Sequence, residues 1–113
     1  MIDRRQYERF TCQLDTMVMD RRDNEIDAII RNASLNGLGI ELLVNWEYNI
    51  GDSFEVYIDG DIFVNMKIVR KNPTEKRTWY YGLYGDDMTQ DNLDRILLLS
   101  NWNICWFLYK YVL

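Results

Sequence analysis

Three arginines stand close together near the start of the chain. Arg4, Arg5 and Arg9 lie within the segment MIDRRQYERF. A guanidinium group stays charged at neutral pH, forms paired hydrogen bonds with phosphate or with the O6/N7 edge of guanine, and stacks flat on a base. The cluster indicates a site for a phosphate or a purine. The competing interpretation is a solvated terminus in which these arginines pair with Asp3 and Glu8.

A second short segment, NASLNG, combines small and polar residues, among them Asn32, Ser34 and Gly37. Asn, Ser and Gly are typical of irregular backbone, so we expect this segment to interrupt the strands on either side. Neither spacing, R-x-x-x-R or N-x-S-x-x-G, is specific by itself.

The sequence offers little for catalysis. It contains no histidine, which excludes Ser-His and Cys-His nucleophile activation and an imidazole base. The adjacent acids Asp86 and Asp87 are more typical of an exposed turn than of a metal site. Cys12 and Cys105 lack a zinc-binding spacing. We therefore expect a protein that is not an enzyme and that holds neither metal nor cofactor.

Composition restricts the class of partner. The chain has 113 residues, of which 48% are hydrophobic, and a formal net charge of -5, which fits one domain with a modest core. The acidic balance argues against DNA, RNA and an oligonucleotide-binding barrel, because those binders need a basic groove. A small anion in a local basic pocket remains compatible with it. No signal peptide precedes MIDRRQ, so we expect a cytoplasmic protein.

Alternation of apolar and polar residues predicts six strands, over 9–19, 25–32, 37–44, 53–59, 62–71 and 78–85. The alternation is clearest where Phe54, Val56 and Ile58 share one face. Asp59 and Gly60 follow at once, and this pair between two alternating runs predicts a tight hairpin.

The period changes after the last strand. Thr89 or Asp91 can cap a helix over 91–100, and residues 103–113 could continue as a second helix. Polar residues inside the apolar tail argue against a transmembrane span. Six strands followed by a helix predict a mainly β fold, a small antiparallel barrel or sandwich. The aromatic tail either closes the open end of that barrel or forms a homo-oligomer or effector interface.

The order of the two polar segments resembles that in the PilZ domain, the bacterial receptor module for cyclic di-GMP. PilZ domains carry R-x-x-x-R, commonly after another Arg, ahead of the first barrel strand, and [D/N]-x-S-x-x-G after the second. Here these are RRQYER and NASLNG, and GLGI, the GD at 51–52 and the GLY from Gly82 are similar to later landmarks of the family. The resemblance covers residues 1–99. It implies a six-stranded antiparallel β-barrel with a C-terminal helix or helices, with residues 100–113 as an aromatic helical extension of the same domain.

The resemblance also implies which residues bind. By likeness to the family, Arg5 and Arg9 hold phosphate and guanine, while Arg4 stacks on a base or serves a second ligand molecule. The full expected cyclic di-GMP site is Arg4, Arg5, Arg9, Asn32, Ser34 and Gly37. Arg70 stands where some relatives stack a side chain on guanine, but we interpret it, like Arg31, as an exposed residue of the barrel surface, and we interpret Trp79 as part of the core or of the barrel surface.

The implied function is that of a single-domain cyclic di-GMP receptor. Such a protein would signal to an effector protein in the control of motility, exopolysaccharide production or virulence. The alternative is a PilZ-fold adaptor that binds protein and no nucleotide. Both functions expect a protein partner, and only the first requires the arginines.

Overall fold

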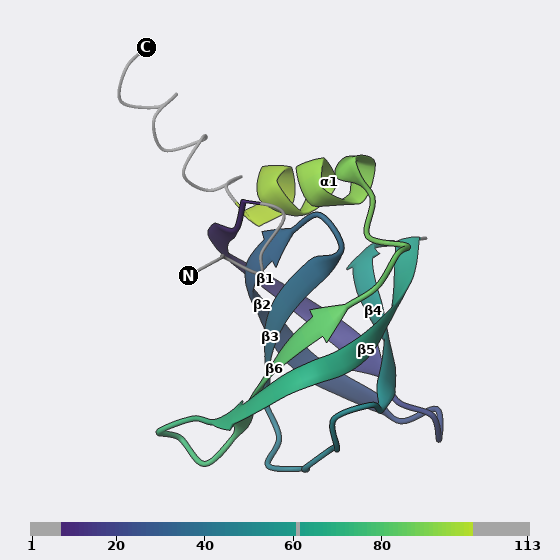
Figure 1. The fold of residues 1–113 in the computed structure, drawn as a ribbon. Coiled ribbons are helices and arrows are strands. Elements are labelled where there is room, and N and C mark those ends of the chain that lie inside the picture. Colours follow the sequence, from purple (N-terminus) through teal and green to yellow (C-terminus); the bar gives the residue numbers. More distant parts are fainter. Residues whose placement is uncertain (1–7, 61, 101–113) are drawn as a thin grey trace, which may run out of the picture.

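The period-two pattern of the sequence forms a closed barrel of six antiparallel strands, with a helix across one end (Figure 1). The computed structural model describes residues 8–60 and 62–100. Its elements are β1 (Phe10–Met19), β2 (Glu25–Ser34), β3 (Gly37–Leu42), β4 (Ser53–Asp59), β5 (Ile62–Pro73), β6 (Trp79–Tyr84) and α1 (Gln90–Ser100). The prediction of a mainly β barrel is confirmed, and the predicted helix over 103–113 lies outside the described residues.

The strands follow the order β1-β2-β3-β6-β5-β4 around the barrel. β1 closes it by pairing with β4, through Val18 with Val56 and Met19 with Glu55. Closure satisfies the backbone groups that an open sheet would leave at its edges. β4 and β5 form the predicted hairpin, in which Asp59 pairs with Ile62.

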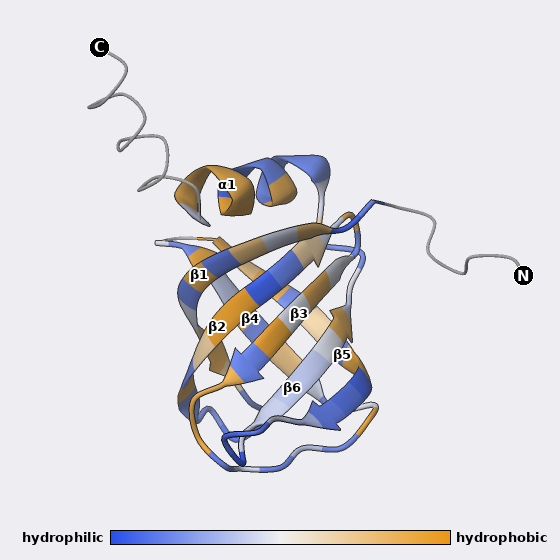
Figure 2. Ribbon diagram, turned by 90° about the vertical axis from the view of Figure 1, so that its left-hand side faces the viewer, coloured by the Kyte–Doolittle hydropathy of each residue, from blue (hydrophilic) through white to orange (hydrophobic). Residues whose placement is uncertain are grey.

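The core fills the barrel from alternate positions of every strand. Phe54, Val56 and Ile58 are buried, as the alternation predicts. The fully buried Tyr81 ring packs edge-on against Phe54, with ring centroids 6.0 Å apart. Along β3 in Figure 2 the orange positions are separated by paler or blue ones, and its leucine and isoleucine residues are buried.

Helix α1 lies across one end of the barrel (Figure 2). Thr89 caps it, because its Oγ1 accepts from the Asn92 backbone N–H at 3.3 Å. Leu93 and Ile96 are buried under the helix, and each such side chain contributes roughly 1.5–3 kcal/mol to the free energy of unfolding. Of the two predicted caps, the structure selects Thr89.

Several predicted boundaries were wrong, among them the end of the third strand, which stops at Leu42. The segment NASLNG is not an irregular loop, because β2 continues to Ser34 and β3 begins at Gly37. The two strands are joined by a two-residue turn in which Asn36 takes a positive φ of 66°, a conformation that Asn tolerates well. β5 also runs further than predicted and ends at Pro73, which pairs with Trp79, since proline is tolerated at the end of a strand.

Within the described ranges, no helix is long and apolar enough to cross a membrane.

Candidate functional site

A β-bulge turns the polar side chains of NASLNG outward. Ile30 pairs with Ile40 and Asn32 pairs with Gly39, so Arg31 is an extra residue in β2. Ile30 is fully buried, and regular alternation would place Asn32 on the same inward face. The extra residue reverses the alternation. Asn32 therefore lies on the outer face, beside Gly39 of β3. Gly39 belongs to the outer face because it alternates with the inward-facing residues of its strand.

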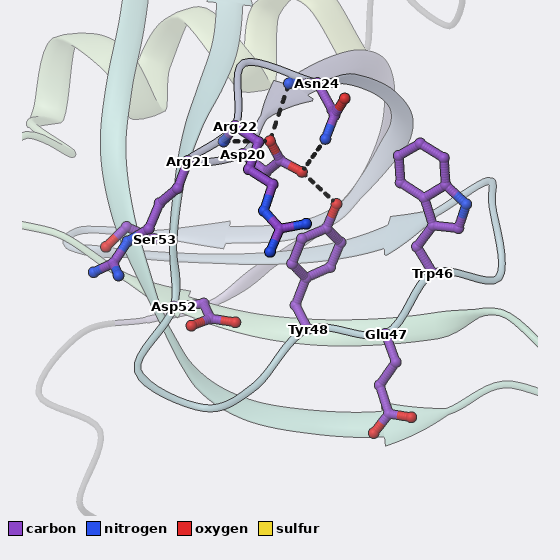
Figure 3. A pocket seen from close by; sticks show the side chains of 9 residues that line it. All are labelled: Asp20, Arg21, Arg22, Asn24, Trp46, Glu47, Tyr48, Asp52 and Ser53. Atoms are coloured by element: carbon purple, nitrogen blue, oxygen red, sulfur yellow. Dashed lines mark hydrogen bonds between the residues drawn. The ribbon is translucent and has the colours of Figure 1, made fainter.

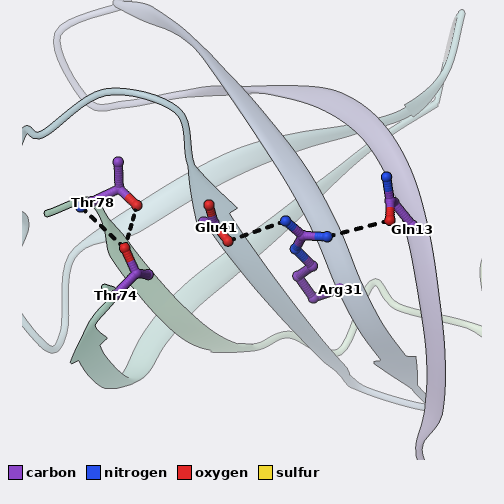
Figure 4. Close-up of polar contacts among 5 residues, drawn as sticks. All are labelled: Gln13, Arg31, Glu41, Thr74 and Thr78. Carbon is purple, nitrogen blue, oxygen red and sulfur yellow. Dashed lines mark hydrogen bonds and ion pairs between the residues drawn. The ribbon is translucent and has the colours of Figure 1, made fainter. Parts of the chain in front are cut away.

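The bulge residue is fixed by polar contacts on both sides (Figure 4). One Arg31 guanidinium nitrogen donates to Glu41 Oε1 of β3 at 3.3 Å, and the other lies 3.4 Å from Gln13 Oε1 of β1. The guanidinium thus ties three adjacent strands together next to Asn32. The contacts of Arg31 hold neighbouring strands together, in agreement with its interpretation as a residue of the barrel surface.

A second bulge, on β5, turns the side chain of Arg70 to the outer face. Ile68 pairs with Leu83 and Arg70 pairs with Gly82, so Val69 is the extra residue. Ile68 is fully buried, and the insertion brings Arg70 to the outer face. A Cβ built on Gly82 would lie 3.1 Å from the Cβ of Arg70, so the Arg70 side chain lies alongside the bare backbone of Gly82.

These pairings form one continuous row on the outside of the barrel. Asn32 of β2 pairs with Gly39 of β3, Gly39 with Gly82 of β6, and Gly82 with Arg70 of β5. Neighbouring strands lie about 4.8 Å apart, so the row spans roughly 14 Å. An amide and a guanidinium thus flank two adjacent glycines, a backbone floor over which the side chains of Asn32, Tyr80 and Arg70 lie.

Tyr80 reaches across this floor. The Asn32 side-chain amide donates a hydrogen bond to the Tyr80 hydroxyl. A Cβ on Gly39 would overlap that hydroxyl and would lie 2.5 Å from Asn32 Nδ2, so glycine is required for the contact. The other end of the amide, Asn32 Oδ1, is buried and accepts no hydrogen bond within the part of the chain described. An acceptor in that position has capacity to bind a donor.

A second outward row lies next to the first. Ser34 pairs with Gly37 at the β2–β3 turn, and Ser34 is 7% exposed. A Cβ on Gly37 would lie 2.9 Å from Ser34 Oγ, so a side chain there would crowd the hydroxyl. Phe10 pairs with Ala33, and Arg9, one residue earlier, comes level with Ser34 where β1 begins.

The structure thus brings together four of the six predicted site residues, namely Arg9, Asn32, Ser34 and Gly37. Arg4 and Arg5 lie outside the described residues. Sequence reasoning missed Gly39, Tyr80 and Gly82 as site residues and interpreted Arg70 as part of the surface only. The repeated glycine of GLG was the available signal, because Gly37 and Gly39 share one face of a strand.

Trp79 lies away from this row. It pairs with Pro73 at the far end of β6, and the Lys71 ammonium sits 5.1 Å from its ring centroid. Its place on the barrel wall agrees with its interpretation as a residue of the core or of the barrel surface.

The family model of the PilZ domain matches residues 3–101. The chain belongs to the PilZ family. That family consists of receptor and adaptor domains and indicates no enzyme activity. The match spans both polar segments, and the PilZ barrel is the fold described above.

Two solved structures show the same fold. One is Bacillus subtilis Inhibitor of motility (MotI/DgrA), at 20% identity and a TM-score of 0.59, covering 97% of this chain and 54% of that chain. The present chain thus spans about half the length of that protein. The other is the PilZ domain of YcgR from Escherichia coli with c-di-GMP, at 15% identity and a TM-score of 0.59, covering 96% and 97% of the two chains. A search of curated proteins finds no match.

Proposed function

We propose that this PilZ domain is a cyclic di-GMP receptor of the bacterial cytoplasm that passes ligand binding on to a protein partner. The family and the fold support the proposal, as does the solved YcgR PilZ domain, which holds c-di-GMP. The controlled process would be motility, exopolysaccharide production or virulence. Motility has additional support from the name of MotI/DgrA, an inhibitor of motility.

One observation carries the proposal. The register of β1 against β2 pairs Phe10 with Ala33 and Thr11 with Asn32. This places the end of the arginine segment beside NASLNG, although the two lie far apart in the sequence. Arg9 immediately precedes Phe10, so a cation of the segment lies close in the fold to the amide of Asn32, and such groups can bind a ligand that carries both phosphates and guanines.

The proposed roles follow from the chemistry of each group. Arg5 and Arg9 bind phosphate and a guanine O6/N7 edge. Asn32 Oδ1, which lacks a partner among the described residues, accepts from the N–H groups of a guanine. Ser34 Oγ donates to the Leu35 backbone carbonyl at 3.2 Å, so towards the ligand it serves as an acceptor. Gly37 keeps the space beside that hydroxyl open.

Isothermal titration calorimetry with cyclic di-GMP tests the proposal. Hydrogen bonds to charged groups contribute about 1.5–3 kcal/mol each, so Arg5→Ala should weaken binding at least tenfold. Arg21→Ala is the matched control, because Arg21 follows the opposite end of β1; its affinity should equal that of the wild type. GTP should give no heat. A wild type that gives no heat with cyclic di-GMP would refute the receptor proposal in favour of a PilZ-fold adaptor.

A further inference from the structure

A surface groove of about 390 Å³ lies between β1 and β4, at the seam where the barrel closes. In the described part of the chain these strands pair only through residues 18–19 of β1 and 55–56 of β4. Beyond these pairs, the Thr16 hydroxyl donates to the Tyr57 backbone carbonyl in place of a ladder bond. The two strands therefore separate and leave the groove open on the outside of the barrel. The residues that line it are Asp15, Thr16, Met17, Tyr57, Ile58 and Asp59.

Apolar side chains form the middle of this side of the barrel. Met17 and Tyr57 line the groove. Met19 lies on the same outward face as Met17, because the buried Val18 alternates with both. The Tyr57 ring packs on Phe63 of β5 with ring centroids 3.8 Å apart, and Phe63 is 42% exposed. The groove thus continues into an apolar strip across β1, β4 and β5, and contiguous exposed apolar surface marks interaction sites in many proteins.

Carboxylates surround this apolar strip. Met17 pairs with Asp27 of β2. Met19 pairs with Glu25 of β2 on one side and with Glu55 of β4 on the other. Two further acids line the groove itself. We call this surface the β1–β4 face; its apolar members are Met17, Met19, Tyr57 and Phe63, and its carboxylates are those of Asp15, Glu25, Asp27, Glu55 and Asp59.

Cations of the described residues do not balance the charge of the β1–β4 face. β1, β4 and residues 25–30 of β2 contain no lysine or arginine. Asp59 forms an ion pair with Arg95 of α1 at 2.7 Å, and the other four carboxylates form none with any described residue. Lys67 of β5 lies one pairing row away from Glu55. Five carboxylates against these two bordering cations leave the face negative.

A larger pocket, of about 490 Å³, lies next to the β1–β2 turn and differs from the groove in its charge (Figure 3). Three carboxylates and the guanidinium groups of Arg21 and Arg22 line it together. Residues 20–23 of that turn, DRRD, carry as many carboxylates as guanidinium groups and therefore add no net charge to the end of the β1–β4 face. The mixed lining of the pocket selects no sign of charge, whereas the β1–β4 face selects cations.

We propose that the β1–β4 face docks a protein segment in which lysines or arginines flank an aliphatic or aromatic side chain. That side chain packs on Met17 and Tyr57 in the groove, and the cations pair with the carboxylates around it. Methionine side chains are flexible and adapt to apolar partners of different shape. Nucleic acids and anionic membranes carry the same sign of charge as the face and are repelled by it. Two copies of the face would repel each other for the same reason.

The β1–β4 face is separate from the candidate nucleotide site. Asp27 and Asn32 lie roughly 15 Å apart along β2, at about 3.3 Å per residue. The carboxylates of the face repel an anion such as cyclic di-GMP, so the nucleotide and the protein segment would occupy different surfaces. The inference rests on the proposed function only for the existence of a protein partner.

Fluorescence anisotropy of a labelled synthetic peptide tests this proposal without nucleotide, at about 0.15 M salt to screen long-range attraction. The probe is a short peptide with a Leu-Trp pair flanked by lysines, and its counterpart carries glutamates in place of the lysines. The lysine peptide should bind and the glutamate peptide should not. Asp27→Asn with Glu55→Gln should weaken binding about tenfold. The matched control, Glu75→Gln with Asp87→Asn, removes the same charge from two exposed positions elsewhere and should leave binding unchanged.

Met17→Gln keeps the length of the side chain in the groove but removes its apolar character, so it should weaken binding of the lysine peptide at least threefold. Ile50→Gln changes a residue that is 62% exposed in the β3–β4 connection and should not weaken it. The amide spectrum of each variant checks that the protein is folded.

Equal binding of the two peptides would overturn the proposal, as would no binding of either. Equal losses in the two charge-neutralised variants would also overturn it, because they would show attraction by net charge alone. A dimer of the protein that Phe63→Ser dissociates would overturn it in favour of a second copy of this chain. Because the assay contains no cyclic di-GMP, its failure and the failure of the receptor proposal are distinguishable.

Discussion

The side-chain amide of Asn32 on β2 donates a hydrogen bond to the hydroxyl of Tyr80 on β6, across the bare backbone of Gly39 on β3. This contact engages the amide by its Nδ2 end, while Oδ1 is buried without a hydrogen-bond partner among the described residues. Tyr80 is therefore a positioning residue for the proposed guanine acceptor.

Tyr80→Phe should weaken cyclic di-GMP binding two- to tenfold. The substitution removes one neutral hydrogen bond, worth about 0.5–1.5 kcal/mol, and lets the Asn32 amide rotate. Calorimetry measures the change, with Tyr57→Phe as the matched control. Tyr57 lies on β4, where its ring packs on Phe63 at a centroid distance of 3.8 Å. Equal affinities of Tyr80→Phe and wild type would contradict the positioning role.

Gly39→Ala should abolish cyclic di-GMP binding and lower the free energy of unfolding by about 1–3 kcal/mol, as overpacking does. The new methyl group would overlap the Tyr80 hydroxyl and approach the Asn32 amide. Gly60→Ala is the control, because a Cβ there has no described heavy atom within 4 Å. Urea denaturation and calorimetry measure both effects. If Gly39→Ala bound normally, the two glycines could not be the floor of the site.

Arg70→Ala should weaken cyclic di-GMP binding about tenfold or more, because a guanidinium at the edge of the glycine floor can reach phosphate or stack on a base. Arg70→Lys should recover only part of the loss, since an ammonium group keeps the charge but neither forks nor stacks. Lys76→Ala removes an exposed cation from the β5–β6 turn and should bind like the wild type. If Arg70→Ala bound cyclic di-GMP as tightly as the wild type, Arg70 would be a residue of the barrel surface with no role in binding.

Lowering the pH should destabilise the protein, in part because the Asp20 carboxylate becomes protonated. Burial raises the pKa of this carboxyl, but hydrogen bonds from Asn24, Tyr48 and Arg22 outweigh it and lower the pKa from 3.8 to about 2. A carboxyl with a depressed folded-state pKa stabilises the fold above its unfolded pKa, and this contribution is lost as the pH falls from about 4 to about 2.

Urea denaturation at about pH 6 and about pH 3 checks this expectation. The stability lost between these two conditions should be smaller in Asp20→Asn than in the wild type. Asp23→Asn is the matched control for a carboxyl-to-amide change in the same turn, because Asn tolerates the positive φ of 61° at that position. Identical losses for the wild type and Asp20→Asn would show that the hydrogen bonds to Asp20 do not depress its pKa.

The strands and the helix could be predicted because their signals are local. Phe54, Val56 and Ile58 point inward because each is two residues from the next, and this is visible in the sequence. Thr89 is a capping residue type four positions before Leu93, where the apolar residues of the helix begin. The hairpin at Asp59 and Gly60 depends on the two residues of the turn itself.

The outer face of the site could not be predicted in the same way. Arg31 and Val69 become extra residues only through the register of β2 on β3 and of β5 on β6. Without that register, regular alternation places Asn32 inside the barrel. Tyr80 meets Asn32 through β3, which lies between their strands, so no spacing in the sequence indicates the contact. The arginine segment was identified because guanidinium groups suit a phosphate or a purine edge, and NASLNG because its place after that segment resembles the PilZ pattern.

The most direct test of the receptor account is the set of amide signals that move when cyclic di-GMP is added to the ¹⁵N-labelled protein. The account predicts shifts at the Asn32 side-chain amide and at the backbone amides of Ser34, Gly37, Gly39 and Gly82, with those of Arg21 and Asn24 unmoved. An unchanged spectrum at saturating nucleotide would contradict the account. Shifts confined to the β1–β2 turn and the β3–β4 connection would contradict the assigned site.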